Sequence, residues 1–187
     1  MASNRYYYTQ KVENKAAHFS TNPKCCFISY QSSDREQAKI VADYLLAAGI
    51  DVYFDQYDGD LRISNQTKNP KHVVESLCKG INNSSHMIVV LSPVTMSSKW
   101  VPFEIGFGYE KTEVLILCLK DILPGTLPEY IRTCKILRDI YDLNGQISKF
   151  MNIEKKLLEA RNQIKTYNSS ENPLTAIMDS LVTDNYQ

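Results

Sequence analysis

One pair of side chains in this sequence has a spacing that suits a catalytic site. Trp100, the only tryptophan, precedes Glu104 by four residues. Residues four apart lie on one face of a helix, so an indole ring and a carboxylate would flank one pocket. Because proline is tolerated in the first turn, Pro102 predicts that this helix begins near Val101 and carries Glu104 in that turn. On spacing alone, the commoner explanation is a half-buried tryptophan and a glutamate that stabilises the helix dipole, so both interpretations stay open.

Other motifs that carry chemistry are missing from the sequence. It has no glycine-rich phosphate loop, no GxSxG nucleophile turn and no HExxH zinc motif. His18, His72 and His86 are scattered, and such histidines are more often surface or core residues than catalysts. The cysteines form no CxxC pair, so we expect buried free thiols and no metal site. They are Cys25, Cys26, Cys78, Cys118 and Cys134.

The composition argues against several classes of protein. The 187 residues carry 21 Lys and Arg against 21 Asp and Glu, and this balance argues against a generic nucleic-acid binder. No apolar run reaches the roughly 18 residues that span a bilayer. The first residues also lack the apolar core of a signal peptide. We therefore expect a cytoplasmic protein that binds neither nucleic acid nor membrane.

Apolar runs alternate with amphipathic stretches along the chain. A helix with a 3.6-residue apolar period is expected after Asp34, ending at Gly49, and another from Pro70. A loop is expected to start at Pro93 and to lead into a helix that reaches about Lys111, and a last helix is expected after residue 140. The predicted strands are Cys25–Tyr30, Asp51–Asp55, His86–Ser92, Glu113–Leu119 and Lys135–Ile140. The alternation predicts an α/β fold: a flavodoxin-like, doubly wound, five-stranded parallel sheet with helices on both faces.

In such a sheet, ligands bind outside the carboxyl ends of the strands. The predicted strands place Ser29 and Tyr30 at one of these ends, Asp55 at a second and Ser92 at a third. Glu104 follows the third of the predicted strands and is expected near the same edge of the sheet.

The chain divides into three parts by its pattern. Residues 1–23 are polar and without convincing periodicity, so we expect an extension outside the core fold. Residues 24–166 hold all the predicted strands and helices and form one domain, while residues 167–187 form a C-terminal tail.

The order of several motifs matches a known pattern. Phe27-Ile28-Ser29-Tyr30 with Ser33-Asp34 forms an opening strand and loop, and Ala47 to Asp55 forms a second strand entered through a glycine turn. Ser98-Lys99-Trp100 with Glu104 fits an S-x-W-x-x-x-E stretch. Together they resemble the Toll/interleukin-1 receptor (TIR) domain, whose BB loop would then be residues 56–69 and whose NAD-cleaving members carry that last stretch. The resemblance covers about residues 24–155.

The resemblance implies a mechanism that these residues support. Enzymatic TIR domains cleave the bond between nicotinamide and ribose in NAD, which is a substrate here and not a cofactor. The nicotinamide is already cationic and departs neutral, so one carboxylate suffices where ordinary glycosidases need two. Glu104 would be catalytic and Trp100 would stack on a base. Ser29 and Tyr30 would hydrogen-bond ribose or phosphate, and Asp55 would border the pocket or anchor the BB loop.

The resemblance also implies a biological setting, with alternatives. The chain looks like the stand-alone TIR proteins of bacterial antiphage defence, the Thoeris kind, which convert NAD into a cyclic or conjugated ADP-ribose signal for a separate effector. Self-association through the BB loop is expected. One alternative is a non-catalytic TIR module that only self-associates. Another is an enzyme like the nucleoside deoxyribosyltransferases, which share the sheet topology and a glutamate-centred cleavage.

Overall fold

The computed structural model describes residues 2–6, 24–54, 70–120, 122–123 and 125–183. Five parallel strands form one sheet in the order β2-β1-β3-β4-β5. They are β1 (Cys25–Ser29), β2 (Asp51–Tyr53), β3 (His86–Leu91), β4 (Glu113–Cys118) and β5 (Lys135–Leu137). This order is the flavodoxin-like one, so the predicted fold class is confirmed.

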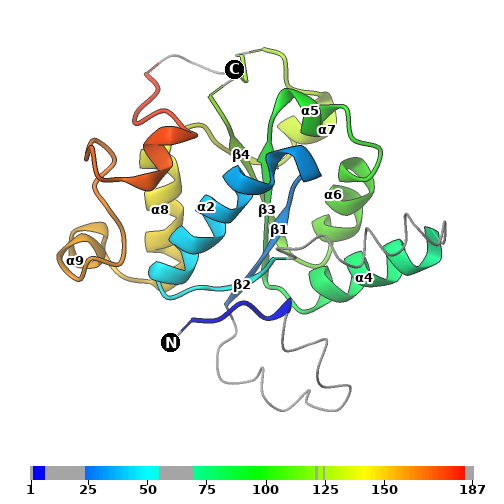
Figure 1. The fold of residues 1–187 in the computed structure, drawn as a ribbon, viewed down its shortest axis with the longest axis horizontal. Helices are drawn as coiled ribbons and strands as arrows, with labels where there is room; N and C mark the ends of the chain where they lie inside the picture. The colour runs from blue at the N-terminus through cyan, green and yellow to red at the C-terminus, as the bar shows by residue number, and fades with distance from the viewer. Residues whose placement is uncertain (1, 7–23, 55–69, 121, 124, 184–187) are drawn as a thin grey trace.

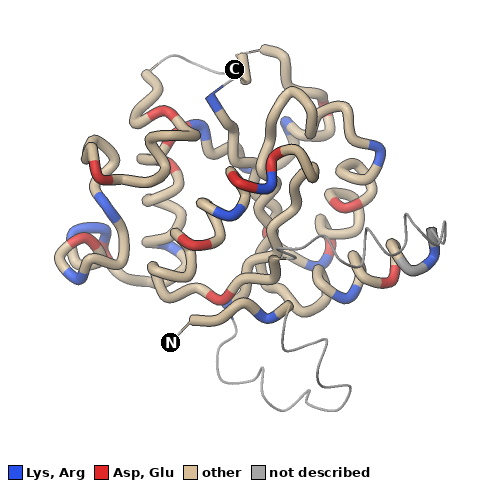
Figure 2. The backbone as a smooth tube through the Cα atoms, viewed as in Figure 1, with Lys and Arg blue, Asp and Glu red and all other residues tan. Residues whose placement is uncertain are grey.

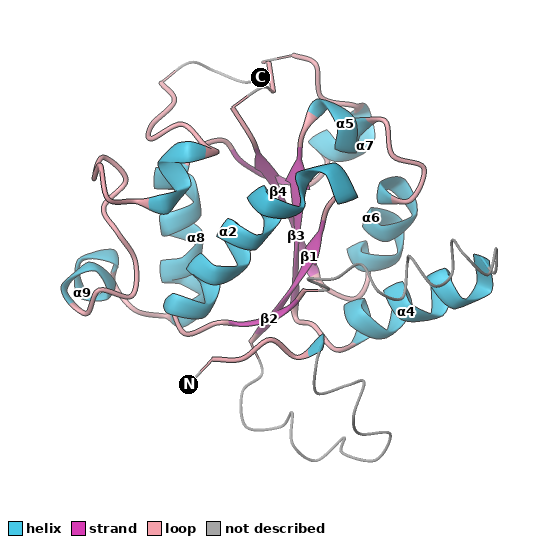
Figure 3. Cartoon of the chain, viewed as in Figure 1, coloured by secondary structure: helices cyan, strands magenta, loops and turns pink. Residues whose placement is uncertain are grey.

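Helices cover both faces of the sheet (Figure 1). One layer holds α2 (Arg35–Ala47), α8 (Ile140–Met151) and α9 (Lys155–Ala160), and the other holds α4 (Pro70–Asn82), α5 (Pro93–Met96), α6 (Val101–Tyr109) and α7 (Glu129–Arg132). Figure 3 shows the sheet between these two layers. Two short 3₁₀ helices, η2 (Ser32–Asp34) and η3 (Pro173–Ala176), complete the described elements.

The central strands are apolar on both faces because both faces are covered. Along β3, Ile88 and Val90 join the core under α2 and α8, while Val89 and Leu91 join the core under α4 and α6. All four side chains are fully buried. This alternation is the period of two that a strand imposes, and it explains why β3 reads as an uninterrupted apolar run.

Two glycines occupy positions at which a side chain would be unfavourable. Gly49 follows α2 with φ +92°, a left-handed conformation that favours glycine, so the predicted helix end is confirmed. Gly80 in α4 faces β1, where an added Cβ would lie 2.6 Å from Phe27 Cε2. The missing side chain therefore lets α4 approach the sheet closely.

The elements differ from the sequence expectation at several boundaries. The loop expected from Pro93 contains the short helix α5, and residues 97–100 separate it from α6. The last expected helix is two helices, because Asn152 ends α8 with φ 52°. The strands β2 and β5 are three residues long, shorter than expected.

Both expected flanking segments contribute to the core. Residues 3–6 of the expected extension lie against β2, where Asn4 forms a parallel bridge with Val52. In the expected tail, Leu174 and Met178 are buried in the α2–α8 core, and Asp179 bridges Asp139. Residues 3–6 thus pair with the sheet although residues 1–23 were expected outside the core fold, and the expected tail contains core residues. Residues 7–23 lie outside the described residues.

Charged residues of both signs occur along the described helices. Figure 2 shows Lys and Arg interspersed with Asp and Glu along the outer helices. None of the helices within the described residues is long and apolar enough to cross a membrane.

Candidate active site

The predicted catalytic glutamate lies in the first turn of α6. Trp100 precedes that helix and its carbonyl accepts the Glu104 N–H at 2.9 Å. Ser98 Oγ accepts the backbone N–H groups of Trp100 at 3.2 Å and Val101 at 3.4 Å, so it satisfies two donors that the helix start leaves open. The helix begins at Val101, as the position of Pro102 indicated.

The fold brings Ser29 and Glu104 together although 75 residues separate them. Ser29 is the last residue of β1, at the carboxyl edge of the sheet, and Ser29 Oγ donates a short hydrogen bond to Glu104 Oε2. Both side chains are buried, with 2% of Ser29 and 7% of Glu104 exposed. A carboxylate and a hydroxyl thus form one buried polar pair at the edge where ligands bind this class of sheet.

Burial changes the acidity of this carboxyl group. Desolvation raises the pKa of Glu104 from 4.5 to about 7, and the hydrogen bond from Ser29 opposes that rise by stabilising the carboxylate. A glutamate with a pKa near neutrality can hold or release a proton at physiological pH. Such a group suits acid–base chemistry or the stabilisation of a developing positive charge.

Trp100 lies at a different depth from Glu104. Its side chain is 38% exposed, and its ring packs edge-on against Phe103 at a centroid distance of 6.3 Å. Phe103, 37% exposed, stacks in turn on Phe107. The helix therefore presents aromatic rings to solvent within a turn of its buried carboxylate.

Of the predicted substrate-binding residues Tyr30 and Asp55, the structure describes only Tyr30. The half-buried Tyr30 packs its ring against Phe54 at a centroid distance of 5.3 Å. Its contact with substrate stays a prediction. Asp55 and the expected BB loop, residues 56–69, lie outside the described residues.

A second buried polar cluster joins two loops at this edge of the sheet. Asp34 Oδ2 accepts hydrogen bonds from Ser92 Oγ at 2.5 Å and Thr95 Oγ1 at 2.8 Å. Ser92 Oγ also accepts the Thr95 N–H at 3.0 Å and so caps α5. Asp34 directly precedes α2, but its side chain makes no capping hydrogen bond to that helix. A proline directly after Ser92 favours a turn, and nothing local in the sequence indicates that Asp34 is the partner of Ser92.

The part of the chain that the structure describes contains no candidate metal site. There, His, Cys, Asp and Glu residues form no group of three or more that could hold a metal ion. His86 lies at the amino end of β3, where it contacts Ser85 and Glu113, and not at the Glu104 edge. All five cysteines are free.

The fold and the site together define a class of protein: a flavodoxin-like α/β domain with a buried glutamate at the carboxyl edge of its sheet. A family model described as TIR domain matches residues 26–150. Because the match covers more than half of the chain, this chain belongs to the TIR domain family, in which NAD-cleaving enzymes and adaptor modules both occur. No curated protein matches the sequence.

Proposed function

We propose that this TIR domain cleaves the bond between nicotinamide and ribose in NAD, with Glu104 as its catalytic residue. The observation that carries the proposal is the buried Ser29–Glu104 pair at the carboxyl edge of the sheet. A buried carboxylate is costly, so its position at the carboxyl edge of the sheet is better explained by chemistry than by stability. The family match supports the same assignment.

The reaction needs only one carboxylate from the protein. As the bond breaks, its electron pair moves to the nicotinamide ring, which leaves neutral, and positive charge develops on the ribose. The Glu104 carboxylate stabilises that charge or holds the ribose hydroxyls, in surroundings dry enough to strengthen the interaction. Water then attacks the ribose carbon and loses one proton, giving ADP-ribose, nicotinamide and H⁺.

Neighbouring side chains have supporting roles in this proposal. Ser29 Oγ keeps one oxygen of the Glu104 carboxylate in place through its hydrogen bond. The exposed ring of Trp100 offers a flat apolar surface on which a nicotinamide or adenine ring stacks. If water is excluded from the site, a nucleophile within the substrate takes its place and the product is cyclic.

The finer biological assignment follows from the resemblance to stand-alone bacterial TIR proteins. We propose that the product is an ADP-ribose-derived signal, sensed by a separate effector protein in cytoplasmic antiphage defence. Assembly of copies through residues 56–69 is part of that proposal. If copies assemble, the turnover number should rise with protein concentration. A turnover number that does not change with concentration, in a protein that stays monomeric, would contradict this assembly.

The decisive experiment measures nicotinamide release from NAD and identifies the other product by mass spectrometry. We expect Glu104→Gln to lower turnover by at least about 100-fold, as loss of a transition-state contact does. Glu110→Gln is the matched control, since Glu110 is exposed at the end of the same helix. Full turnover in Glu104→Gln would remove Glu104 from catalysis.

The second candidate function is a non-catalytic self-associating module. The observation that favours it is the exposed aromatic surface of Trp100 and Phe103, since contiguous exposed rings also occur at protein interfaces. The two functions separate in one experiment. A pure module releases no nicotinamide at any concentration, and its self-association weakens in a Trp100→Ala variant.

A further inference from the structure

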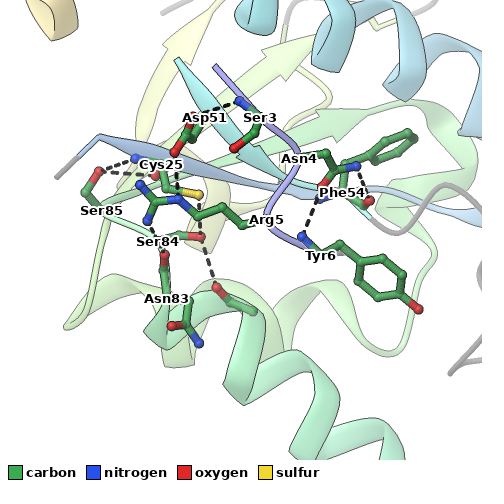
Figure 4. Close-up of polar contacts among 11 residues, drawn as sticks. Ser3, Asn4, Arg5, Tyr6, Cys25, Asp51, Phe54, Asn83, Ser84 and Ser85 are labelled. Carbon is green, nitrogen blue, oxygen red and sulfur yellow. Dashed lines mark hydrogen bonds and ion pairs between the residues drawn. The ribbon is translucent and has the colours of Figure 1, made fainter. Parts of the chain in front are cut away.

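The first residues of the chain add a strand segment to the outer edge of β2 (Figure 4). Val52 N–H donates to the Ser3 carbonyl at 3.1 Å, and Arg5 N–H donates to the Val52 carbonyl at 2.7 Å. An edge strand leaves one row of backbone groups without partners. Residues 3–5 satisfy both backbone groups of Val52, the central residue of this three-residue strand.

A buried ion pair anchors this segment. Arg5 Nε donates to Asp51 Oδ2 at 2.9 Å, and Ser3 N–H donates to Asp51 Oδ1 at 2.8 Å, so both carboxylate oxygens are engaged. Arg5 Nη1 also donates to the Asn83 carbonyl at 3.3 Å. The side chains of Arg5 and Asp51 are only 6% and 10% exposed. The segment is therefore bound at a defined register and not merely laid over the sheet.

Between the two anchoring residues, Asn4 holds the backbone just past the end of β2. Asn4 Nδ2 donates to the Phe54 carbonyl at 2.8 Å, and the Phe54 N–H donates to Asn4 Oδ1 at 3.1 Å. Asn4 Oδ1 also accepts the Tyr6 N–H at 3.2 Å. One side-chain amide thus replaces the two hydrogen bonds that a neighbouring strand would make with Phe54.

Phe54 connects this clamp to the candidate active site. Its side chain is 3% exposed, and its ring packs on Tyr30. Tyr30 directly follows Ser29, the residue whose hydroxyl donates to Glu104. Phe54 is therefore linked to the end of β1 through one ring contact and one peptide bond.

We propose that Asn4 is a positioning residue for the active site, acting through Phe54 and Tyr30 to hold Ser29 against Glu104. The proposal rests on the proposed NAD-cleaving function and adds to it a residue from a segment that the family match, residues 26–150, leaves out. Asn4 touches neither substrate nor reacting atoms in this role. It keeps the hydroxyl of Ser29 within bonding distance of the carboxylate.

The test compares two variants of the full chain. Asn4→Ala removes the whole clamp, while the isosteric Asn4→Asp removes only the donor to the Phe54 carbonyl and sets a charge against it. The hydrogen bond from Ser29 holds down the Glu104 pKa, so a loosened Ser29 lets that pKa rise. We expect the acid limb of the turnover–pH profile to move by about half a pH unit toward alkaline pH in both variants. Because this shift halves the ionised fraction of Glu104 at pH 7, we expect the turnover number to fall about twofold there, with less change in KM.

Asn172→Ala is the matched control for lost stability. The Asn172 side chain also makes three hydrogen bonds to backbone groups, all within residues 165–174. It is 1% exposed, so its loss destabilises the fold without touching the Phe54–Tyr30 contact. We expect its pH profile to match that of the unchanged protein, measured per folded molecule.

Hydrogen–deuterium exchange gives a readout that needs no activity. A peptide covering Phe27–Tyr30 is expected to exchange about threefold faster at its last amides in Asn4→Ala, and at the original rate in Asn172→Ala. If the unchanged protein releases no nicotinamide, the proposed function fails. If it is active but both Asn4 variants keep the original pH limb and exchange rates, the positioning role alone is refuted.

Discussion

Burial of Glu104 has a consequence for stability that can be measured without any substrate. In the unfolded chain this carboxyl group ionises with a pKa near 4.5, but burial raises its pKa to about 7 in the fold. Between these two values the folded chain binds more protons than the unfolded chain, so its free energy of unfolding falls as pH rises. Above pH 7 both states are ionised and the penalty is constant.

The penalty has a size that follows from these two values. Each pKa unit is worth about 1.4 kcal/mol, so the charged carboxylate costs about 3 kcal/mol of stability at pH 8. Glu104→Gln removes the charge and keeps the shape, and an amide still bonds with the Ser29 hydroxyl. We therefore expect the variant to be about 3 kcal/mol more stable than the unchanged protein at pH 8, but less than about 1 kcal/mol more stable at pH 5.

Urea denaturation at pH 5 and pH 8 measures both differences. The exposed Glu110 is the control, because Glu110→Gln removes no buried charge and is expected to leave the free energy of unfolding unchanged at either pH. A Glu104→Gln variant whose stability gain is the same at both pH values would refute the reasoning. So would a variant that is less stable than the unchanged protein at pH 8. The expected pattern, a more stable but inactive protein, is typical of residues kept for function.

Three further predictions test other contacts. Ser29→Ala removes a hydrogen bond to a charged group, so the acid limb of turnover should move about one pH unit toward alkaline pH, and an unmoved limb would contradict the Ser29–Glu104 link. Arg5→Ala leaves Asp51 buried with one partner fewer, so urea denaturation should show a loss of about 3–5 kcal/mol. That loss should shrink when Asp51→Asn is also present, and full additivity would rule out the ion pair as its cause. Trp100→Ala should raise KM for NAD about 3- to 10-fold with a smaller change in turnover, and an unchanged KM would exclude stacking.

The fold could be predicted because its signals are local and repeated. The strands β3 and β4 are continuous apolar runs, which a sheet covered on both faces requires, and Gly49 marks a helix end that needs a left-handed residue. The position of Glu104 in a first helical turn followed from Pro102. Each of these three features depends only on a residue and its near neighbours in the sequence.

The contacts of the site were harder to predict because they are distant in the chain. Nothing near Ser29 indicates that its hydroxyl would meet Glu104 and not a backbone group, and Asp34 has the sequence context of a simple helix cap. A short polar residue fits a cap, a turn or a buried network equally well from its neighbours alone. Only the three-dimensional arrangement decides among them.

The limits of the domain were missed for a related reason. Periodicity placed the domain at residues 24–166, yet Arg5 and Asn4 complete one edge of the sheet, and Asn172 closes the loop before the buried Leu174. These segments contribute a few core side chains together with polar side chains and backbone pairing, and so few apolar residues form no detectable period. They also give buried polar groups their hydrogen-bond partners, and a carboxylate such as Asp51 cannot stay buried without such partners. The structural unit therefore includes every segment that supplies a partner to its buried polar groups, here from at least Ser3 to Asp179. A fragment limited to residues 24–166 would leave Asp51 without its partner Arg5.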